Sequence, residues 1–204
     1  MDEAAYSTPD PYLRAVRSRL APPEMLAEQG GLAFLQAYLQ GRFLTPFSEL
    51  TGCRIEAIDE QQGAVTMAMT MPATEWLCRF SRCVAPGAIA SLANSCSLAS
   101  GWLLVQPAQS FAGLAHSTSF FRAVPADGRL LRAEARGTIR GRGLANVDID
   151  VYNADGQLAA SAHAFAQLID SSKRQKQTAS EVKRILATLL FTDIVGSTER
   201  PAPG

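Results

Sequence analysis

The sequence predicts an α+β fold in which one antiparallel sheet covers one long central helix. Residues 88–105 carry apolar side chains at steps of three and four, directly after the backbone break at Pro86 and Gly87. Most other residues of this segment are Ala, Ser or Gly, so a sheet can approach the helix axis closely. Two segments of alternating polarity precede it and four follow it, an order typical of α+β proteins.

The part of the chain before the strands is expected to be helical. Residues 1–21 are polar with a weak helical pattern, and we interpret them as a loose or docking segment. A helix is predicted over residues 22–41, because two prolines stand at its first positions and a glycine at its end. Residues 46–52, bracketed by Pro and Gly, are expected to form a loop.

Six segments alternate in polarity and are predicted to be strands. The connections among the last four are short, which favours antiparallel pairing, and Asn153–Gly156 has the composition of a hairpin turn. The predicted strands cover residues 53–59, 64–71, 111–124, 129–140, 144–152 and 158–169. Together with the two helices they define one domain over residues 22–170.

The C-terminal part differs in composition from this domain. Residues 171–184 are polar and basic without aromatic side chains, and are interpreted as a linker or an exposed helix. Residues 185–195 are strongly apolar and are predicted to be a buried strand that begins another domain, residues 185–204.

Composition excludes several classes of function. The 19 basic residues balance the 19 acidic ones, so charge favours neither nucleic acid nor an anionic membrane as partner. We find no apolar run long enough for a transmembrane helix and no secretory signal at the N-terminus. The four cysteines lack paired spacing, which suits free thiols in the cytoplasm better than disulfides or a metal site.

Four short motifs, in this order, resemble the PaaI-like acyl-CoA thioesterases of the hot-dog fold over residues 31–169. They are Leu50–Ile55, Val84–Ala88, Ser119–Val124 and Asp155–Ala159. The resemblance implies a sheet wrapped around the central helix, an acyl-CoA or similar thioester as ligand, and no cofactor. It also implies a homodimer or tetramer, because active sites of the family form between two subunits.

The family's catalytic motif is altered in this chain. Family members begin the central helix with His-Gly-Gly and carry Asp or Glu seven residues later. Here the His position is Ala85, the first Gly is Pro86, which has no N–H to give, and the second Gly is kept as Gly87. The carboxylate position is Asn94, a poor nucleophile and no base, and the family's polar residue on the next strand falls near Gly113.

Other residues could replace the lost groups. His116, on the strand after the helix, is a candidate base, or else a core or interface histidine. Cys96 lies on the apolar helix face, where a buried thiol is usually inert. Arg140 and Arg142 lie in a turn where the family is often basic, and could meet CoA phosphates or form an ordinary charged hairpin. His163 is expected on the surface or at an interface.

Residues 184–200 carry a second resemblance, to the first strand and turn of class III adenylate/guanylate cyclase domains. Asp193 matches a metal ligand of that family, and Gly196–Thr198 matches the turn near the nucleotide phosphates. The remaining cyclase residues are not in this chain, so no cyclase activity is expected. We interpret the segment as the start of a truncated cyclase domain, from a longer chain or a truncated gene product.

Three functions remain open from the sequence. The favoured one is an acyl-CoA-binding module that in a parent chain regulates the cyclase. The second is an active acyl-CoA thioesterase with an altered site, in which Asn94 positions water. The third is a scaffold whose dimer only brings two cyclase domains together.

Overall fold

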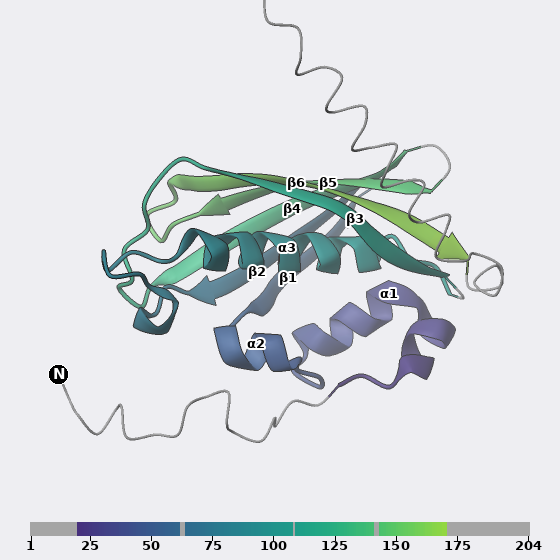
Figure 1. The fold of residues 1–204 in the computed structure, drawn as a ribbon. Helices are drawn as coiled ribbons and strands as arrows, with labels where there is room; N and C mark the ends of the chain where they lie inside the picture. The colour runs from purple at the N-terminus through teal and green to yellow at the C-terminus, as the bar shows by residue number, and fades with distance from the viewer. Residues whose placement is uncertain (1–19, 62–63, 108, 141–142, 171–204) are drawn as a thin grey trace, which may run out of the picture.

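The computed structural model describes residues 20–61, 64–107, 109–140 and 143–170. Its centre is helix α3 (Pro86–Leu103), over which one six-stranded antiparallel sheet is curved (Figure 1). The strands are β1 (Arg54–Gln61), β2 (Ala64–Pro72), β3 (Gln109–Phe120), β4 (Leu130–Arg140), β5 (Leu144–Tyr152) and β6 (Leu158–Asp170). The predicted fold class is confirmed.

The strand order in the sheet is β1-β2-β4-β5-β6-β3. Strand β3 therefore lies at an edge beside β6, with Gly113 opposite Ala166 and Ser117 opposite His163. The strand predicted over residues 111–124 ends at Phe120, because the next two backbone N–H groups both donate to the carbonyl of Ala159 and the chain leaves the sheet. The other edge is β1, so within the described part of the chain each of these two edge strands pairs with one neighbour.

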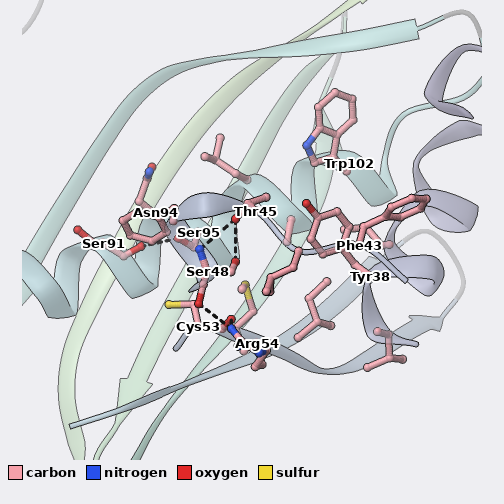
Figure 2. Close-up of a pocket in the computed structure, with 18 of the residues that line it drawn as sticks. Tyr38, Phe43, Thr45, Ser48, Cys53, Arg54, Ser91, Asn94, Ser95 and Trp102 are labelled. Carbon is pink, nitrogen blue, oxygen red and sulfur yellow. Dashed lines mark hydrogen bonds between the residues drawn. The ribbon is translucent and has the colours of Figure 1, made fainter. Parts of the chain in front are cut away.

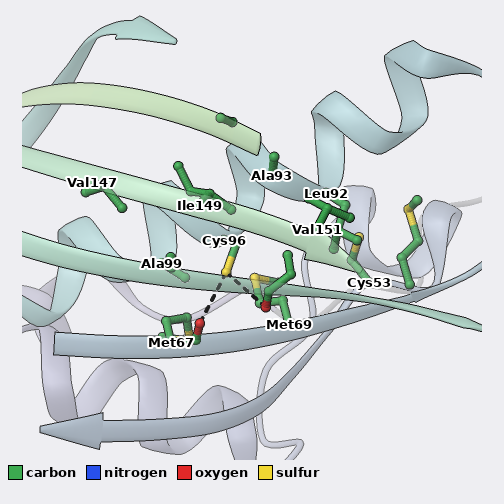
Figure 3. Packing of buried hydrophobic residues seen from close by; sticks show 14 of the residues in the cluster. Cys53, Met67, Met69, Leu92, Ala93, Cys96, Ala99, Val147, Ile149 and Val151 are labelled. Atoms are coloured by element: carbon green, nitrogen blue, oxygen red, sulfur yellow. Dashed lines mark hydrogen bonds between the residues drawn. The ribbon is translucent and has the colours of Figure 1, made fainter. Parts of the chain in front are cut away.

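One face of α3 forms the core, as its apolar spacing predicts. Its side chains are buried against the inner face of the sheet (Figure 3). The sheet contributes alanines that let it come close, among them Ala133, Ala135 and Ala160, none of which has measurable exposure. Burial raises the pKa of the Cys96 thiol to about 12. That thiol is protonated at neutral pH, which supports its interpretation as inert.

The segment predicted as a loop over residues 46–52 is instead a short helix, α2 (Pro46–Thr51). The Thr45 hydroxyl caps it by accepting a hydrogen bond from the Ser48 N–H at 3.0 Å, and Gly52 ends it at φ 74°. The Thr-Pro start and the Gly end are ordinary helix signals, but six residues carry too little periodicity to reveal the helix between them.

The predicted N-terminal helix is present as α1 (Pro23–Leu39), but it breaks at Gly30, where φ is 77°. The break lets Gly31 press against the end of α3. Its N–H donates to the Val105 carbonyl at 3.2 Å, and a Cβ built there would lie 1.6 Å from the Trp102 carbonyl oxygen. No side chain larger than hydrogen fits this contact.

Helices α1 and α2 lie along the side of α3 that the sheet leaves uncovered (Figure 1). Aromatic rings join the two layers, because the Phe34 ring centroid of α1 lies 5.8 Å from that of Trp102 of α3. Within α1 the Phe34 ring also packs against Tyr38, at 5.2 Å. A 3-10 turn, η3 (Glu75–Leu77), lies in the long connection between β2 and α3. The helix layer therefore packs against the C-terminal end of α3, at Trp102.

Several expectations concern residues outside the described ranges. They are the segment before residue 20, the linker, the cyclase-like segment with Asp193, and Arg142. Within the described residues no helix is both long enough and apolar enough to cross a membrane.

Candidate functional site

A cleft of about 980 Å³ lies between the uncovered side of α3 and the helices α1 and α2. Its floor is a stripe of α3 residues at helical spacing, Ala90, Ser91, Asn94, Ser95, Leu98 and Trp102. The opposite wall is mainly apolar, and includes Phe34, Tyr38, Leu39, Phe43, Leu44 and Phe47. This size and character are typical of small-molecule sites.

The cleft is polar at one end of the α3 stripe and aromatic at the other. Figure 2 shows Ser91, Asn94 and Ser95 grouped at one end and Trp102 with Tyr38 at the other. The serine hydroxyls donate along their own helix, from Ser91 to the Gly87 carbonyl and from Ser95 to the Ser91 carbonyl, each at 2.8 Å. Their donors are thus used internally, and their oxygens remain as acceptors.

Asn94 is exposed on this stripe and lines the cleft. Its amide supplies both a donor and an acceptor to anything bound there, but it cannot take a proton at neutral pH. The structure therefore places the altered catalytic position in a ligand-sized cavity, with an amide where a carboxylate would be needed for acid–base chemistry.

His116 of β3 lines the same cleft and is half-buried. Burial lowers the pKa of its imidazole. Nδ1 lies 3.4 Å from the Thr118 hydroxyl, while Nε2 is enclosed with no hydrogen-bond partner among the described residues. A neutral imidazole of this kind can accept one proton, so His116 is the candidate base that the cleft contains.

Pro86, Gly87 and Gly113 are not among the residues that line this cleft. Pro86 and Gly87 form the start of α3, and Gly87 precedes Asn94 by seven residues, about 10 Å along the helix axis. Gly113 is exposed on β3, and its nearest side-chain neighbour is Leu98. Arg140 is the last residue of β4. Within one chain, the start of α3 and Asn94 are too far apart to touch the same reacting atom.

His163 lies on the sheet face turned away from α3, since its neighbours Ala162 and Ala164 are the buried ones. Its Nδ1 is 2.6 Å from an Asp148 carboxylate oxygen. The sheet separates it from the cleft, in keeping with the surface position expected for it. No cluster of three or more metal-ligating side chains occurs among the described residues.

Sequence reasoning missed most of the cleft. One signal was available: Ser91, Asn94, Ser95, Leu98 and Trp102 recur at helical spacing and form a second face of α3. The cleft residues of α2 were not predicted. Residues 46–52 show no helical periodicity, so they were expected to form a loop.

The lowered pKa of His116 predicts a pH-dependent contribution to stability. The unfolded chain, with a histidine pKa of about 6.5, then binds more protons than the folded one, so this contribution is present above that pH and is lost as pH falls toward the folded pKa. The melting temperature of wild type minus that of His116→Gln should be smaller at pH 5 than at pH 8. A melting-temperature difference that stays constant with pH would contradict a lowered pKa for His116. Carboxylates occur in both proteins, so their titration cancels in this difference.

Comparisons with known proteins agree on the fold. No family model and no curated protein sequence matches this chain. Solved structures do match: the PaaI protein of E. coli, from the phenylacetic acid degradation operon, has a TM-score of 0.56 at 20% identity, covering 67% of this chain and 93% of that one.

Two further structures give the same result. A phenylacetic acid degradation-related protein from Ralstonia eutropha has a TM-score of 0.58 at 24% identity, over 66% of this chain and 98% of that one. A thioesterase from Haemophilus influenzae has a TM-score of 0.55 at 19% identity, over 61% and 83%. At these identities the likeness shows the hot-dog fold, as the sequence motifs predicted.

Proposed function

We propose that this hot-dog domain binds an acyl-CoA or a similar thioester in the cleft beside α3, and that hydrolysis is absent or weak. The observation that carries the proposal is Asn94: it lines a ligand-sized cleft on the fold of known thioesterases, with an amide at the position where the resembling family has a carboxylate. Such a site retains polar contacts for a carbonyl but lacks the group that would attack it or activate water.

The start of α3 supports the same proposal. Pro86 is the first helical residue and brings no N–H, and the cap residue Ala85 makes no side-chain hydrogen bond. A developing oxyanion at this helix start would therefore lack the donor that Gly provides in the resembling family.

Titration with acyl-CoA tests this function directly. Heat of binding and release of free thiol are followed in the same samples. We expect saturable binding without thiol release. Turnover at enzyme-like rates would instead establish the second candidate, an active thioesterase, in which His116, a residue of the cleft lining, is the candidate base. If acyl-CoA neither binds nor is hydrolysed, the scaffold function is the one that stands.

We also propose that the protein is a homodimer joined at the β3 edge. Strand β3 is long and carries no proline, and among the described strands its one neighbour is β6. Its exposed residues Ala115, Ser117 and Ser119 are small and uncharged, so no charged or bulky side chain blocks pairing with a second copy. A second copy could also bring its own α3 start toward Asn94, which the same chain's helix start cannot reach.

A charge at this edge should disrupt the dimer. Ala115→Lys places an ammonium group on the unpaired strand and is expected to halve the mass measured by light scattering at micromolar concentration. The control Ala154→Lys, in the exposed turn between β5 and β6, should leave the mass unchanged. A monomeric wild type, or a dimer that persists in Ala115→Lys, would refute this interface.

In a longer parent chain, we propose that ligand binding regulates a nucleotide cyclase. The support is the sequence pattern of residues 184–200 alone. The test is to join residues 1–204 to a complete class III cyclase domain and measure cyclic nucleotide production with and without acyl-CoA. Equal rates would reject regulation.

A further inference from the structure

We propose that the cleft selects a medium-chain acyl group, with its carbonyl at Asn94 and its methyl end at Trp102. The inference rests on the proposed function and adds to it the length and direction of the bound chain. It follows from the polarity of the cleft, from the distance between its two ends, and from the way Trp102 is held.

The polarity of the cleft fixes the direction of the chain. Asn94, Ser91 and Ser95 offer an amide donor and hydroxyl acceptors at one end (Figure 2). At the other end Trp102 and Tyr38 offer aromatic surface. A thioester carbonyl accepts hydrogen bonds and is costly to bury among rings, whereas methylene groups gain free energy there. The thioester end of the acyl chain is therefore expected at Asn94.

The spacing along α3 sets the length. Trp102 follows Asn94 by eight residues on one continuous helix, which is about 12 Å along the axis. An extended hydrocarbon advances about 1.25 Å per carbon, given carbon–carbon bonds of about 1.5 Å. Roughly ten carbons thus span the cleft from the amide to the indole.

Trp102 is a rigid end to this path. Its ring packs edge-on against Phe111 at a centroid distance of 4.6 Å, and against Phe34 of α1 at 5.8 Å. The backbone beside it is held by the close contact with Gly31. Because β3 and α1 both contact the Trp102 side chain, it cannot change its rotamer to admit a longer acyl chain unless α1 moves away from α3.

Affinity should therefore depend on chain length in two regimes. Each added methylene buried in the cleft should tighten binding by about fourfold, the equilibrium equivalent of the usual transfer free energy of one methylene. We expect this gain up to about ten carbons and a plateau or loss beyond. A series of straight-chain acyl-CoAs from acetyl to hexadecanoyl, measured by calorimetry, gives the profile.

Tryptophan fluorescence locates the chain within the protein. The chain has two tryptophans, and Trp76 is 69% exposed and outside the cleft, so Trp76→Phe leaves Trp102 as the single reporter. Decanoyl-CoA brominated at its terminal carbon should quench this fluorescence strongly, and the analogue brominated next to the carbonyl only weakly. The reverse order, or equal quenching, would overturn the proposed direction.

A cleft-filling variant completes the test. Leu98→Trp enlarges the side chain between the two ends of the stripe and should abolish the preference for ten carbons, while Ala154→Trp adds the same ring system in the distant β5–β6 turn and should not. If acyl-CoAs bind with no dependence on length, this inference fails and the proposed function stands. If no acyl-CoA binds wild type, both fail.

Discussion

Replacing both Pro86 with Gly and Asn94 with Asp is expected to convert the domain into a clear thioesterase. The Asn94→Asp exchange would supply a carboxylate in the cleft, and general acid–base groups contribute about a hundredfold or more to rates. The Pro86→Gly exchange would supply a backbone N–H at the first helical position, and an oxyanion donor contributes about 10²–10³-fold in related sites. The measurement is thiol release from a panel of acyl-CoAs.

The single variants provide the matched controls. In the proposed dimer, the α3 start of one subunit approaches Asn94 of the other, so the two groups act as one unit. Such groups are non-additive, so Pro86→Gly or Asn94→Asp alone should release thiol only weakly, and the double variant should exceed the product of the two gains. The fold should tolerate both, since Gly starts this helix in the resembling family and Asp is nearly isosteric with Asn. A folded double variant that binds CoA yet stays inert would show that the site lies elsewhere.

Gly31→Ala is expected to be the most damaging single substitution for stability in the α1 layer. Its new methyl carbon would lie 1.6 Å from the Trp102 carbonyl oxygen and 2.5 Å from the carbonyl carbon, both backbone atoms that cannot rotate away. Helix α1 must then withdraw from α3, and the buried Leu35 and Ala37 lose contacts. We expect a loss of about 3 kcal/mol, or roughly 6–12 °C in melting temperature.

The same exchange at Gly87 is the control. No heavy atom lies within 4 Å of a Cβ built at Gly87, and its φ is not positive. Alanine there should be neutral or stabilise the helix by up to about 1 kcal/mol. Thermal unfolding followed by circular dichroism compares the two. If Gly31→Ala has the same melting temperature as wild type, helix α1 does not pack on α3 in solution.

The core was predictable because its signals are local and periodic. The spacing of Ile89, Leu92, Cys96, Ala99 and Leu103 gives one face of α3, and the structure buries all of them. Strand bounds such as residues 144–152 also agree, since alternating polarity marks where a strand faces two environments.

The cleft was not predictable in the same way, because its walls come from segments far apart in the sequence. Asn94 and His116 were recognised one by one, but only the tertiary fold places both in the same cleft as Trp102 and Tyr38. The short helix α2 and the break at Gly30 depend on a cap and on a helix–helix contact, which no periodic pattern encodes. The candidate residues were therefore easier to find than the cavity.

A crystal structure with bound ligand tests the central claim most directly. The ligand of choice is a ketone analogue of decanoyl-CoA, in which a methylene replaces the thioester sulfur, so that the carbonyl is kept and hydrolysis is impossible. We predict density for the acyl chain between α3 and the helices α1 and α2, with the carbonyl oxygen within hydrogen-bond distance of the Asn94 side chain and the methyl end against Trp102. A chain bound elsewhere, with this cleft empty at saturating ligand, would contradict the account.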